Sequence, residues 1–208
     1  MGNRKAAIGV ALLAGLGLGG GALATQAPEG QDPSDFVYVP PNPGRAELPE
    51  RAPDVPYVPT SQTLVDAMLE LAGVRQGDVV YDLGSGDGRI VVTAAKKYGV
   101  HGVGIDINPE RIQEAEANAQ AAGVQRLTEF RQQDIFKADI GDASVVTMYL
   151  LPSVNNRMKP KLLRDLAPGT RIVSHAFDIE GWEPLKTIEV EGTTLYLWVV
   201  PENPSQVR

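Results

Sequence analysis

A glycine-rich turn stands where it could hold a ligand. The apolar run Val79–Leu83 leads into Gly84-Ser85-Gly86-Asp87-Gly88, and the amphipathic stretch Arg89–Tyr98 follows. Glycine lets the backbone approach a ligand closely, and the start of a helix presents free N–H groups. A strand, a turn and a helix in this order hold nucleotide-like ligands in open α/β sheets.

The spacing of the glycines indicates the class of ligand. They follow the pattern G-x-G-x-G with Asp82 two residues ahead, whereas dinucleotide-binding folds carry G-x-G-x-x-G. We therefore predict S-adenosylmethionine (SAM), and not NAD, as the cofactor.

Other polar residues fall at the ends of expected strands. Asp82 ends the first strand and Asp106 the second, while Asp134 follows the third; Tyr149 lies near the end of the fourth, and His175 ends the fifth. Because ligands bind at the carboxyl ends of parallel strands, we expect all five on one rim. Asp106 also follows the glycine turn at the distance where an acid meets ribose hydroxyls, and a carboxylate can accept hydrogen bonds from both.

Beyond residue 59 the hydrophobic residues recur in a regular pattern. Helix-like and strand-like periods alternate, which predicts a parallel sheet with right-handed crossovers. The last two strands, joined by Glu191-Gly192, predict an antiparallel hairpin. The predicted fold is α/β, with a Rossmann-like, mostly parallel sheet and a C-terminal antiparallel hairpin. The expected helices cover 64–72, 90–98, 109–122 and 154–166, and the expected strands 79–83, 102–106, 127–130, 143–151, 171–175, 187–190 and 193–200.

Residues 1–27 have the pattern of a targeting segment. Arg4 and Lys5 precede the apolar run Ala6–Leu18, and Ala22-Leu23-Ala24 offers small residues for cleavage. We predict a signal peptide, with an uncleaved N-terminal anchor, and hence membrane association, as the alternative. Either one predicts a body in the cell envelope. SAM is made in the cytosol, however, so the supply of cofactor argues for a body that faces the cytoplasm.

Prolines dominate the segment that follows. Nine of the 16 prolines lie in residues 28–59, which predicts an extended linker over 28–58. The sequence Tyr-Val-Pro occurs twice there, at 38–40 and at 57–59, and the second copy adjoins the first helix. A SAM-binding domain over 59–202 and a short tail over 203–208 complete the predicted organisation.

Charge and composition exclude several classes of function. The net charge of -7 argues against nucleic acid as the main partner, because neutralising phosphates needs clustered lysine and arginine. Cysteine is absent, which excludes disulfides, thiolate metal sites and a cysteine nucleophile.

The run Asp82–Arg89 resembles motif I of class I SAM-dependent methyltransferases. The set is most similar to the small lysine methyltransferases related to the ATP synthase c-subunit lysine methyltransferase, and more distantly to the Dot1 histone methyltransferases. The resemblance spans about residues 56–184. It rests on Tyr57-Val58-Pro59-Thr60, Gly104-Ile105-Asp106, Gln133-Asp134-Ile135-Phe136, Leu150-Leu151-Pro152-Ser153 and Val173-Ser174.

The resemblance implies a role for individual positions. The glycine turn would line the methionine part of SAM, with Asp82 near its amino group. Asp106 would bind the ribose hydroxyls, and Asp134 the adenine amino group, with Ile135 or Phe136 beside the ring. The implied cofactor-binding residues are Tyr57, Thr60, Asp82, Gly84, Ser85, Gly86, Gly88, Asp106, Asp134 and Ile135.

The same resemblance predicts methyl transfer from SAM, with a protein lysine amino group as the favoured acceptor. Such a transfer requires no metal and no covalent intermediate. Tyr149 and His175 are the candidate catalytic residues for deprotonating the lysine, and water is the alternative. The Asn-Pro-Pro-Tyr signature of amino-group methyltransferases is absent. A small molecule or lipid acceptor, or a non-catalytic envelope module on a SAM-type scaffold, are therefore the alternatives.

Each candidate residue also has a purely structural interpretation. Asp82 could cap the turn that follows it, and Asp106 could cap the helix that begins at Pro109. Asp134 could stabilise a turn. Tyr149 could belong to the packed core, and His175 could be a hydrogen-bonded histidine at the end of a strand.

Overall fold

The computed structural model describes residues 52 and 54–207 of the 208-residue chain. The predicted signal segment 1–27, the first Tyr-Val-Pro copy and most of the predicted linker lie outside the described residues. Within the described residues, no helix has the length and apolar character needed to cross a membrane.

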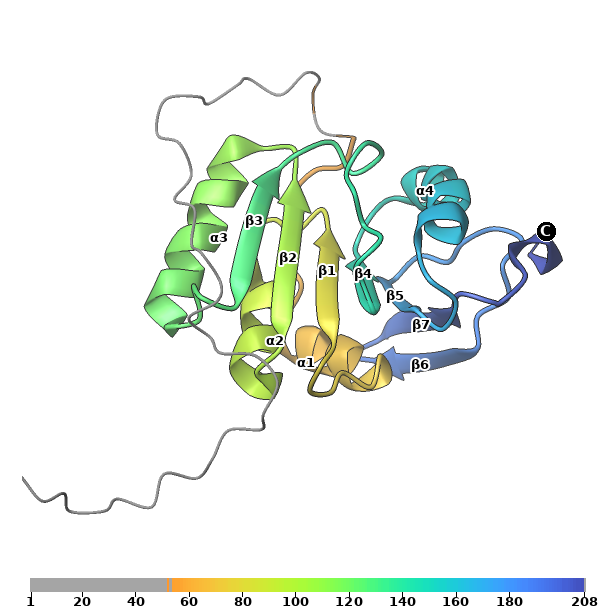
Figure 1. Ribbon diagram of the computed structural model, residues 1–208, viewed down its shortest axis with the longest axis horizontal. Coiled ribbons are helices and arrows are strands. Elements are labelled where there is room, and N and C mark those ends of the chain that lie inside the picture. The colour runs from red at the N-terminus through yellow and green to blue at the C-terminus, as the bar shows by residue number, and fades with distance from the viewer. Residues whose placement is uncertain (1–51, 53, 208) are drawn as a thin grey trace, which may run out of the picture. The chain divides into compact units, whose positions relative to one another are not determined.

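A seven-stranded sheet organises the structure, in the order β3-β2-β1-β4-β5-β7-β6 (Figure 1). The first five strands are parallel neighbours, whereas β7 runs antiparallel to β5 and to β6. This confirms the predicted mostly parallel sheet with its C-terminal antiparallel hairpin. The strands are β1 (Val79–Leu83), β2 (His101–Asp106), β3 (Thr128–Gln132), β4 (Val145–Met148), β5 (Arg171–His175), β6 (Lys186–Val190) and β7 (Thr193–Val199).

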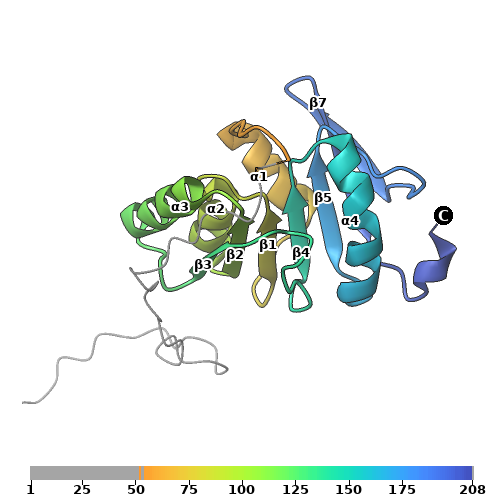
Figure 2. The same ribbon diagram turned by 90° about the horizontal axis from the view of Figure 1, so that it is seen from above.

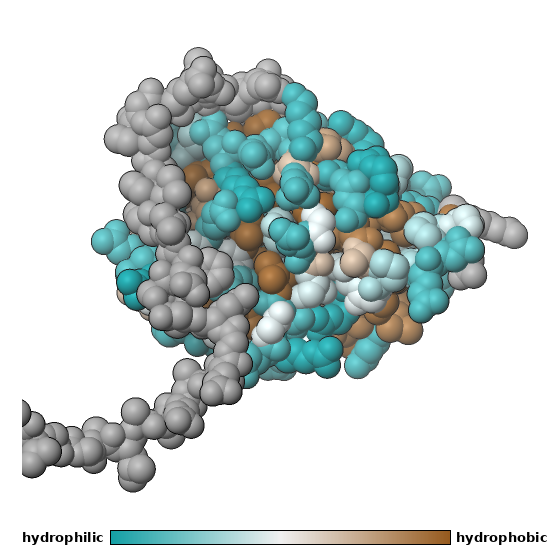
Figure 3. All heavy atoms as spheres, in the orientation of Figure 1, coloured by the Kyte–Doolittle hydropathy of each residue, from teal (hydrophilic) through white to brown (hydrophobic). Residues whose placement is uncertain are grey.

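Helices cover both faces of the sheet (Figure 2). The two larger hydrophobic clusters lie on opposite faces because neighbouring strand residues point to opposite sides of the sheet. Val145 and Val173 pack with α1 and α2, whereas Val146 and Ile172 pack with α4. The outer surface in Figure 3 is mostly hydrophilic, with apolar residues showing between the polar ones. The helices are α1 (Gln62–Leu71), α2 (Arg89–Tyr98), α3 (Pro109–Ala122), α4 (Pro152–Asp165) and the short 3₁₀ helix η2 (Pro204–Gln206).

The fourth strand is shorter than predicted. The sequence suggests a strand over 143–151, but β4 covers only Val145–Met148. Tyr149 and Leu150 leave the ladder, and α4 begins at Pro152, two residues earlier than expected. The apolar residues 149–151 therefore lie at the rim of a cavity and at the start of α4. A hydrophobic run in the sequence cannot be told apart from a longer strand by its pattern alone.

A buried ion pair fixes the amino end of the sheet. Asp78, 7% exposed, pairs with the Arg171 guanidinium, and it accepts hydrogen bonds from the Ser144 hydroxyl at 2.8 Å and the Arg75 N–H at 2.8 Å. Arg171 also donates to the carbonyl of Gly73, just after α1, at 2.8 Å. Burial acts to raise the pKa of Asp78, but these hydrogen bonds and the arginine charge hold it below its usual value.

The hairpin turn also connects to α1. Glu191 and Gly192 have φ of 52° and 73°, and positive φ at both positions is what a two-residue type I′ turn requires. Ser61 is the N-cap of α1 and accepts the Leu64 N–H at 3.3 Å. Its hydroxyl donates to Glu191 Oε2 at 2.8 Å. The start of α1 is thereby held to the tip of the hairpin.

Candidate functional site

A cavity of about 440 Å³ opens at the carboxyl ends of β1, β2 and β4, the size of a small-molecule site. It contains eight of the predicted site residues. Its lining is Val55, Pro56, Tyr57, Val58, Pro59, Thr60, Asp82, Gly84, Ser85, Gly86, Asp87, Arg89, Ile90, Asp106, Asn108, Arg111, Tyr149 and Leu150. The cavity therefore includes the last residues of the predicted linker.

The glycine turn needs glycine for two separate reasons. Gly84 and Gly86 have φ of 83° and 53°, a region that other residues rarely adopt. A Cβ atom on Gly86 would also lie 2.4 Å from the ring of Tyr57. Gly88 differs, because it lies outside the cavity lining, where a Cβ would meet Ala115 and Phe130 at 2.7 Å. Its role is to let α2 pack closely.

Asp106 connects the glycine turn to the end of β2. Its Oδ2 accepts the Gly86 N–H at 2.9 Å, and its Oδ1 accepts the Asn108 N–H at 2.8 Å. A carboxylate has about four acceptor positions, so capacity remains for two hydroxyl groups of a ligand. The structural interpretation and the ligand-binding interpretation of Asp106 are therefore compatible.

Asp82 is a buried carboxyl group beside this cavity. The residue is 3% exposed, and its Oδ1 accepts a hydrogen bond from the Thr147 hydroxyl of β4 at 2.7 Å. Burial raises the pKa of Asp82 to about 7, and the negative charges of Asp106 and Asp87 act in the same direction. A buried carboxyl group with this pKa favours a cationic ligand, because a positive charge would stabilise its ionised form.

A strap of residues 55–60 covers part of the cavity. Arg89 pairs with Asp87 at 2.6 Å and donates to the carbonyl oxygen of Thr60 at 2.7 Å. Arg111 stacks on the Tyr57 ring, with 4.6 Å from the guanidinium to the ring centroid. Burial acts to raise the pKa of Asp87, but the hydrogen bonds and charge of Arg89 hold it below its usual value. Two arginines thus hold the strap to the glycine turn and to α3.

Asp134 and Ile135 line a smaller adjoining cavity of about 70 Å³. This cavity shares Gly84, Asp106 and Leu150 with the larger one. Asp134 Oδ1 accepts the Phe136 N–H at 3.0 Å, which is the turn-stabilising role of the structural interpretation. The position beside the larger cavity is also where the predicted adenine contact would lie.

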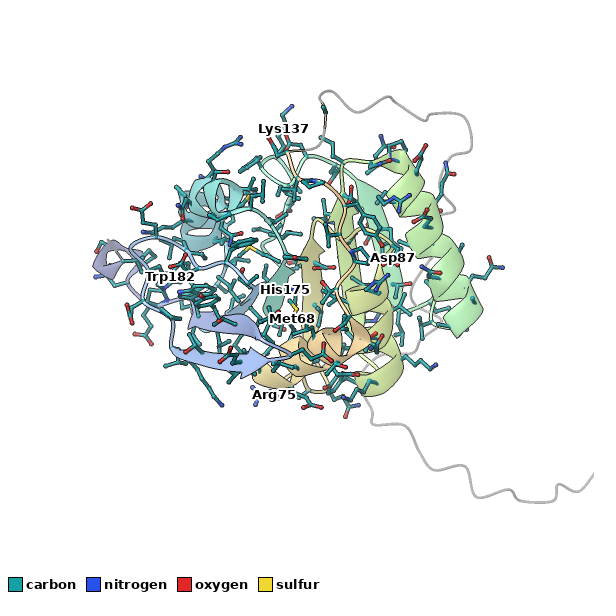
Figure 4. The ribbon with its side chains drawn as sticks, turned by 180° about the vertical axis from the view of Figure 1, so that it is seen from behind. Met68, Arg75, Asp87, Lys137, His175 and Trp182 are labelled. Carbon is teal, nitrogen blue, oxygen red and sulfur yellow. The ribbon has the colours of Figure 1, made fainter. Side chains whose placement is uncertain are left out.

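Of the two candidate catalytic residues, Tyr149 lines the cavity and His175 packs behind it. The rings of Tyr149 and His175 stack with centroids 3.7 Å apart. His175 is 5% exposed and its Nδ1 lies 3.2 Å from the Thr60 hydroxyl, in the interior of the molecule (Figure 4). Burial lowers the pKa of His175, so its neutral form is favoured. This geometry suits support of Tyr149 better than contact with an acceptor.

Four polar side chains that hold the strap or contact Asp82 were not among the sequence-based candidates. They are Asp87, Arg89, Arg111 and Thr147. Asp87 and Arg89 lie within or directly after the glycine turn, so their positions carried a signal. No sequence pattern indicates Arg111 or Thr147. Arg111 contacts the strap, and Thr147 reaches Asp82 because β4 lies beside β1 in this register.

The cavity fits the predicted cofactor. SAM carries a positive sulfur and an amino group, and three carboxyl groups line the cavity, those of Asp82, Asp87 and Asp106. The positive-φ glycines let the backbone follow a ligand closely. Among the described residues, the buried Ser85 hydroxyl has no hydrogen-bond partner in the chain, so a donor or acceptor can come from the ligand.

A family model and the sequence relatives of this chain indicate the same family of methyltransferases. A model of the ANTKMT methyltransferase domain matches residues 82–186. The chain is 51% identical to a protein-lysine N-methyltransferase of Saccharolobus islandicus, over 73% of this chain and 97% of that protein. It is 37% identical to the adenine nucleotide translocase lysine N-methyltransferase of Mus musculus, over 73% of this chain but only 65% of the mouse protein.

Among solved structures, the fold is similar to that of a protein from Salinibacter ruber in complex with S-adenosylhomocysteine (SAH). The two share 55% sequence identity with a TM-score of 0.69, over 70% of this chain and 95% of the other. That protein is described as an RNA methyltransferase.

Proposed function

We propose, from the premise that this chain belongs to the ANTKMT methyltransferase domain family, that it methylates a lysine amino group in a protein. Membership of this family confirms the prediction of a SAM-dependent methyltransferase. Family membership therefore favours an enzyme over the alternative of a non-catalytic envelope module. The membrane association predicted for residues 1–27 is not tested by any described residue.

The residues of the cavity would hold the cofactor in one orientation. When bound, SAM supplies a methyl group on a positively charged sulfur. The Asp106 carboxylate would accept hydrogen bonds from the ribose, and Asp82 would face the amino group. The strap around Tyr57, held by Arg89 and Arg111, would exclude water. Holding donor and acceptor in a fixed geometry supplies much of the rate of such a transfer.

The acceptor assignment rests chiefly on one relative. The Saccharolobus islandicus protein, which matches over nearly its full length, is named a protein-lysine N-methyltransferase. The net charge of -7 also suits a basic acceptor better than a polyanion. A lysine must be neutral before it accepts a methyl group, and either Tyr149 at the cavity wall or water can take the proton.

RNA is the second candidate acceptor, because the Salinibacter ruber structure is described as an RNA methyltransferase. The charge of this chain argues against it, since RNA binding draws on clustered basic residues. A protein acceptor and an RNA acceptor would place the transferred methyl group in different fractions of the same assay.

The direct test is transfer of a radioactive methyl group from SAM to a cell lysate. We expect the label to enter material that protease releases and RNase does not, and to be recovered as methyl-lysine after hydrolysis. An Asp106→Asn variant serves as the impaired control and should transfer little label. Label in an RNase-sensitive fraction would instead assign RNA, and label in an organic extract would assign a lipid or small molecule.

A further inference from the structure

A strained turn follows β5 at the edge of the site. Ala176 has a φ of 67°, and the Phe177 N–H donates to the His175 carbonyl at 2.9 Å. Together these define a γ-turn with a positive φ, which is rare and strained. The Ala176 N–H also donates to Thr194 of β7 at 2.9 Å. Strain of this kind persists where its surroundings impose it, and it concentrates at functional sites.

A buried amide of α4 imposes this turn. Asn155 is 0% exposed, and its Nδ2 lies within hydrogen-bond distance of Ser174 Oγ at 3.2 Å, the Phe177 carbonyl at 3.1 Å and the Asp178 carbonyl at 3.2 Å. The Ser174 hydroxyl donates to the same Phe177 carbonyl at 2.6 Å. A buried Nδ2 group is costly without such partners, so this group and the turn stabilise each other, whereas the buried Oδ1 atom of Asn155 has no hydrogen-bond partner among the described residues.

The turn places two rings beside Tyr149. His175 stacks on Tyr149 with centroids 3.7 Å apart and an interplanar angle of 26°. Phe177 lies 6.4 Å away at an angle of 21°. The γ-turn therefore connects both neighbours of Tyr149, and Tyr149 lines the cavity. Tyr149 and Phe177 are half-buried, so they retain surface that another molecule can contact.

We propose that Asn155, Ser174 and the γ-turn at Ala176 are positioning elements that hold Tyr149 and Phe177 as an aromatic wall for the hydrocarbon arm of the acceptor lysine. This inference rests on the proposed function. Lysine methylenes pack well on apolar surfaces, and aromatic faces attract the ammonium group and its methylated products. Tyr149 lines the cavity, whereas Phe177 packs beside it outside the lining, so loss of the Phe177 ring should spare the cofactor.

The test uses a bisubstrate probe, in which a nitrogen with a 4-aminobutyl arm replaces the sulfur of SAH. Calorimetry on the full-length chain gives the Kd of the probe and of SAH. Their ratio contains the charged nitrogen as well as the arm, but the contribution of the nitrogen cancels when the ratio is compared between wild type and variant. In the wild type we expect the probe to bind about tenfold tighter than SAH. In Phe177→Ala and in Asn155→Ala we expect most of this advantage to be lost while the Kd of SAH stays within about twofold.

Two further variants separate positioning from general stability. Phe177→Tyr should retain the advantage, because it keeps the ring. Leu185→Ala is the matched control, since Leu185 is 70% exposed on the same segment and should change neither Kd. If Asn155→Ala does not fold, Phe177→Ala alone still tests whether the aromatic wall binds the arm of the probe.

The outcomes are distinguishable. A wild-type probe that binds no tighter than SAH would contradict the lysine acceptor of the proposed function, and the wall with it. A wild-type advantage that survives in Phe177→Ala would overturn the aromatic wall alone and leave the proposed function intact. Loss of SAH binding to the same extent as probe binding would also overturn it, because the residues would then support the whole cavity.

Discussion

At the scale of single residues, Asp82 has the least ordinary environment in the site. It combines deep burial, a 2.7 Å hydrogen bond from Thr147 and a pKa of about 7. Most aspartates ionise near pH 4. The raised pKa means that Asp82 loses its proton within the range of pH where enzymes are commonly assayed.

This pKa predicts that the affinity for SAM depends on pH. The positively charged amino group favours the ionised form of Asp82, so affinity is complete above the pKa and falls as the pH drops below it. Between pH 7.5 and 5.5 we expect about a 20-fold loss in affinity by calorimetry. The stability of the ligand-free protein should depend on pH in the opposite direction. Because the pKa of Asp82 is raised in the folded state, the free energy of unfolding should decrease as the pH rises toward 7.

The control for this prediction is Asp82→Asn, which cannot ionise. Its affinity should be lower and nearly constant over the same range of pH. An equal dependence on pH in Asp82→Asn would assign the titration to another group.

The glycine turn allows a second prediction at this scale, from a matched pair of substitutions. Gly86→Ala and Gly99→Ala both place alanine at a positive φ, 53° and 65°, which costs about 1 kcal/mol of stability each. Only the Cβ at position 86 meets the Tyr57 ring, at 2.4 Å, since nothing lies within 4 Å of one at 99. Thermal unfolding should show the backbone cost in both variants and a further loss in Gly86→Ala, where the Tyr57 ring must shift. SAM binding should weaken markedly in Gly86→Ala alone.

Equal SAM affinity in the two glycine variants would show that the close contact between Tyr57 and the turn does not matter for binding. In that case the strap would not close over the cofactor.

Much of the site at this scale could be predicted from sequence. Asp82, Asp106 and the glycine turn are neighbours along the chain or end adjacent strands, so their types and spacing indicated the rim. Thr147 and Arg111 could not be found in this way. Their contacts depend on the register of β4 against β1 and on the path of the strap, which no local pattern encodes.

At the scale of elements, the rim depends on a sheet that is held at its other end. Asp78 and Arg171 join the segment after α1 to the starts of β1 and β5. Asp82 and His175 lie toward the opposite ends of these two strands, and each strand is five residues long. The ion pair therefore contributes to the site without touching it.

Removing one partner of this pair should destabilise the fold. Arg171→Ala leaves the Asp78 carboxylate buried without its cation, and we expect a loss of about 3 kcal/mol in the free energy of unfolding, measured with urea at pH 7. Because the pKa of Asp78 is lowered, its contribution is present above pH 4 and disappears as the pH falls through the folded-state pKa.

Lys97→Ala is the comparison, because it removes exposed ion pairs with Asp66 and Glu70. Such pairs contribute little, so its urea midpoint should not move measurably. Equal destabilisation by the two substitutions would contradict the assignment of the buried pair.

Element order was predictable because hydrophobic periods and capping residues recur locally. The helix at Pro109–Ala122 and the strand at Arg171–His175 have the bounds that the sequence suggested. The segments 149–151 and 176–178 were not predictable, because apolar residues there serve the cavity and the γ-turn. Asn155 and Ala176 carry no sequence signal for a role, since the turn they share forms only when α4 packs beside β5.

At the scale of the whole molecule, the chain combines a methyltransferase domain with an N-terminal region outside the described residues. The signal or anchor in residues 1–27 stays a prediction. The described residues that line the two cavities include those of the strap at 55–60, of the glycine turn and of the ends of β1, β2 and β4. Binding of SAM therefore depends on contacts distributed over β1, β2, the strap and the rim of β4.

Calorimetric titration of the full-length chain and of Asp106→Asn with SAH is the decisive test of the cofactor site. Asp106 accepts the Gly86 N–H and lies where the ribose is expected, and asparagine keeps its shape but lacks its charge. We expect micromolar binding to the wild type and a loss of about tenfold or more in the variant. Equal affinity in the two proteins, or no binding to the wild type, would contradict the assignment of this cavity as the cofactor site.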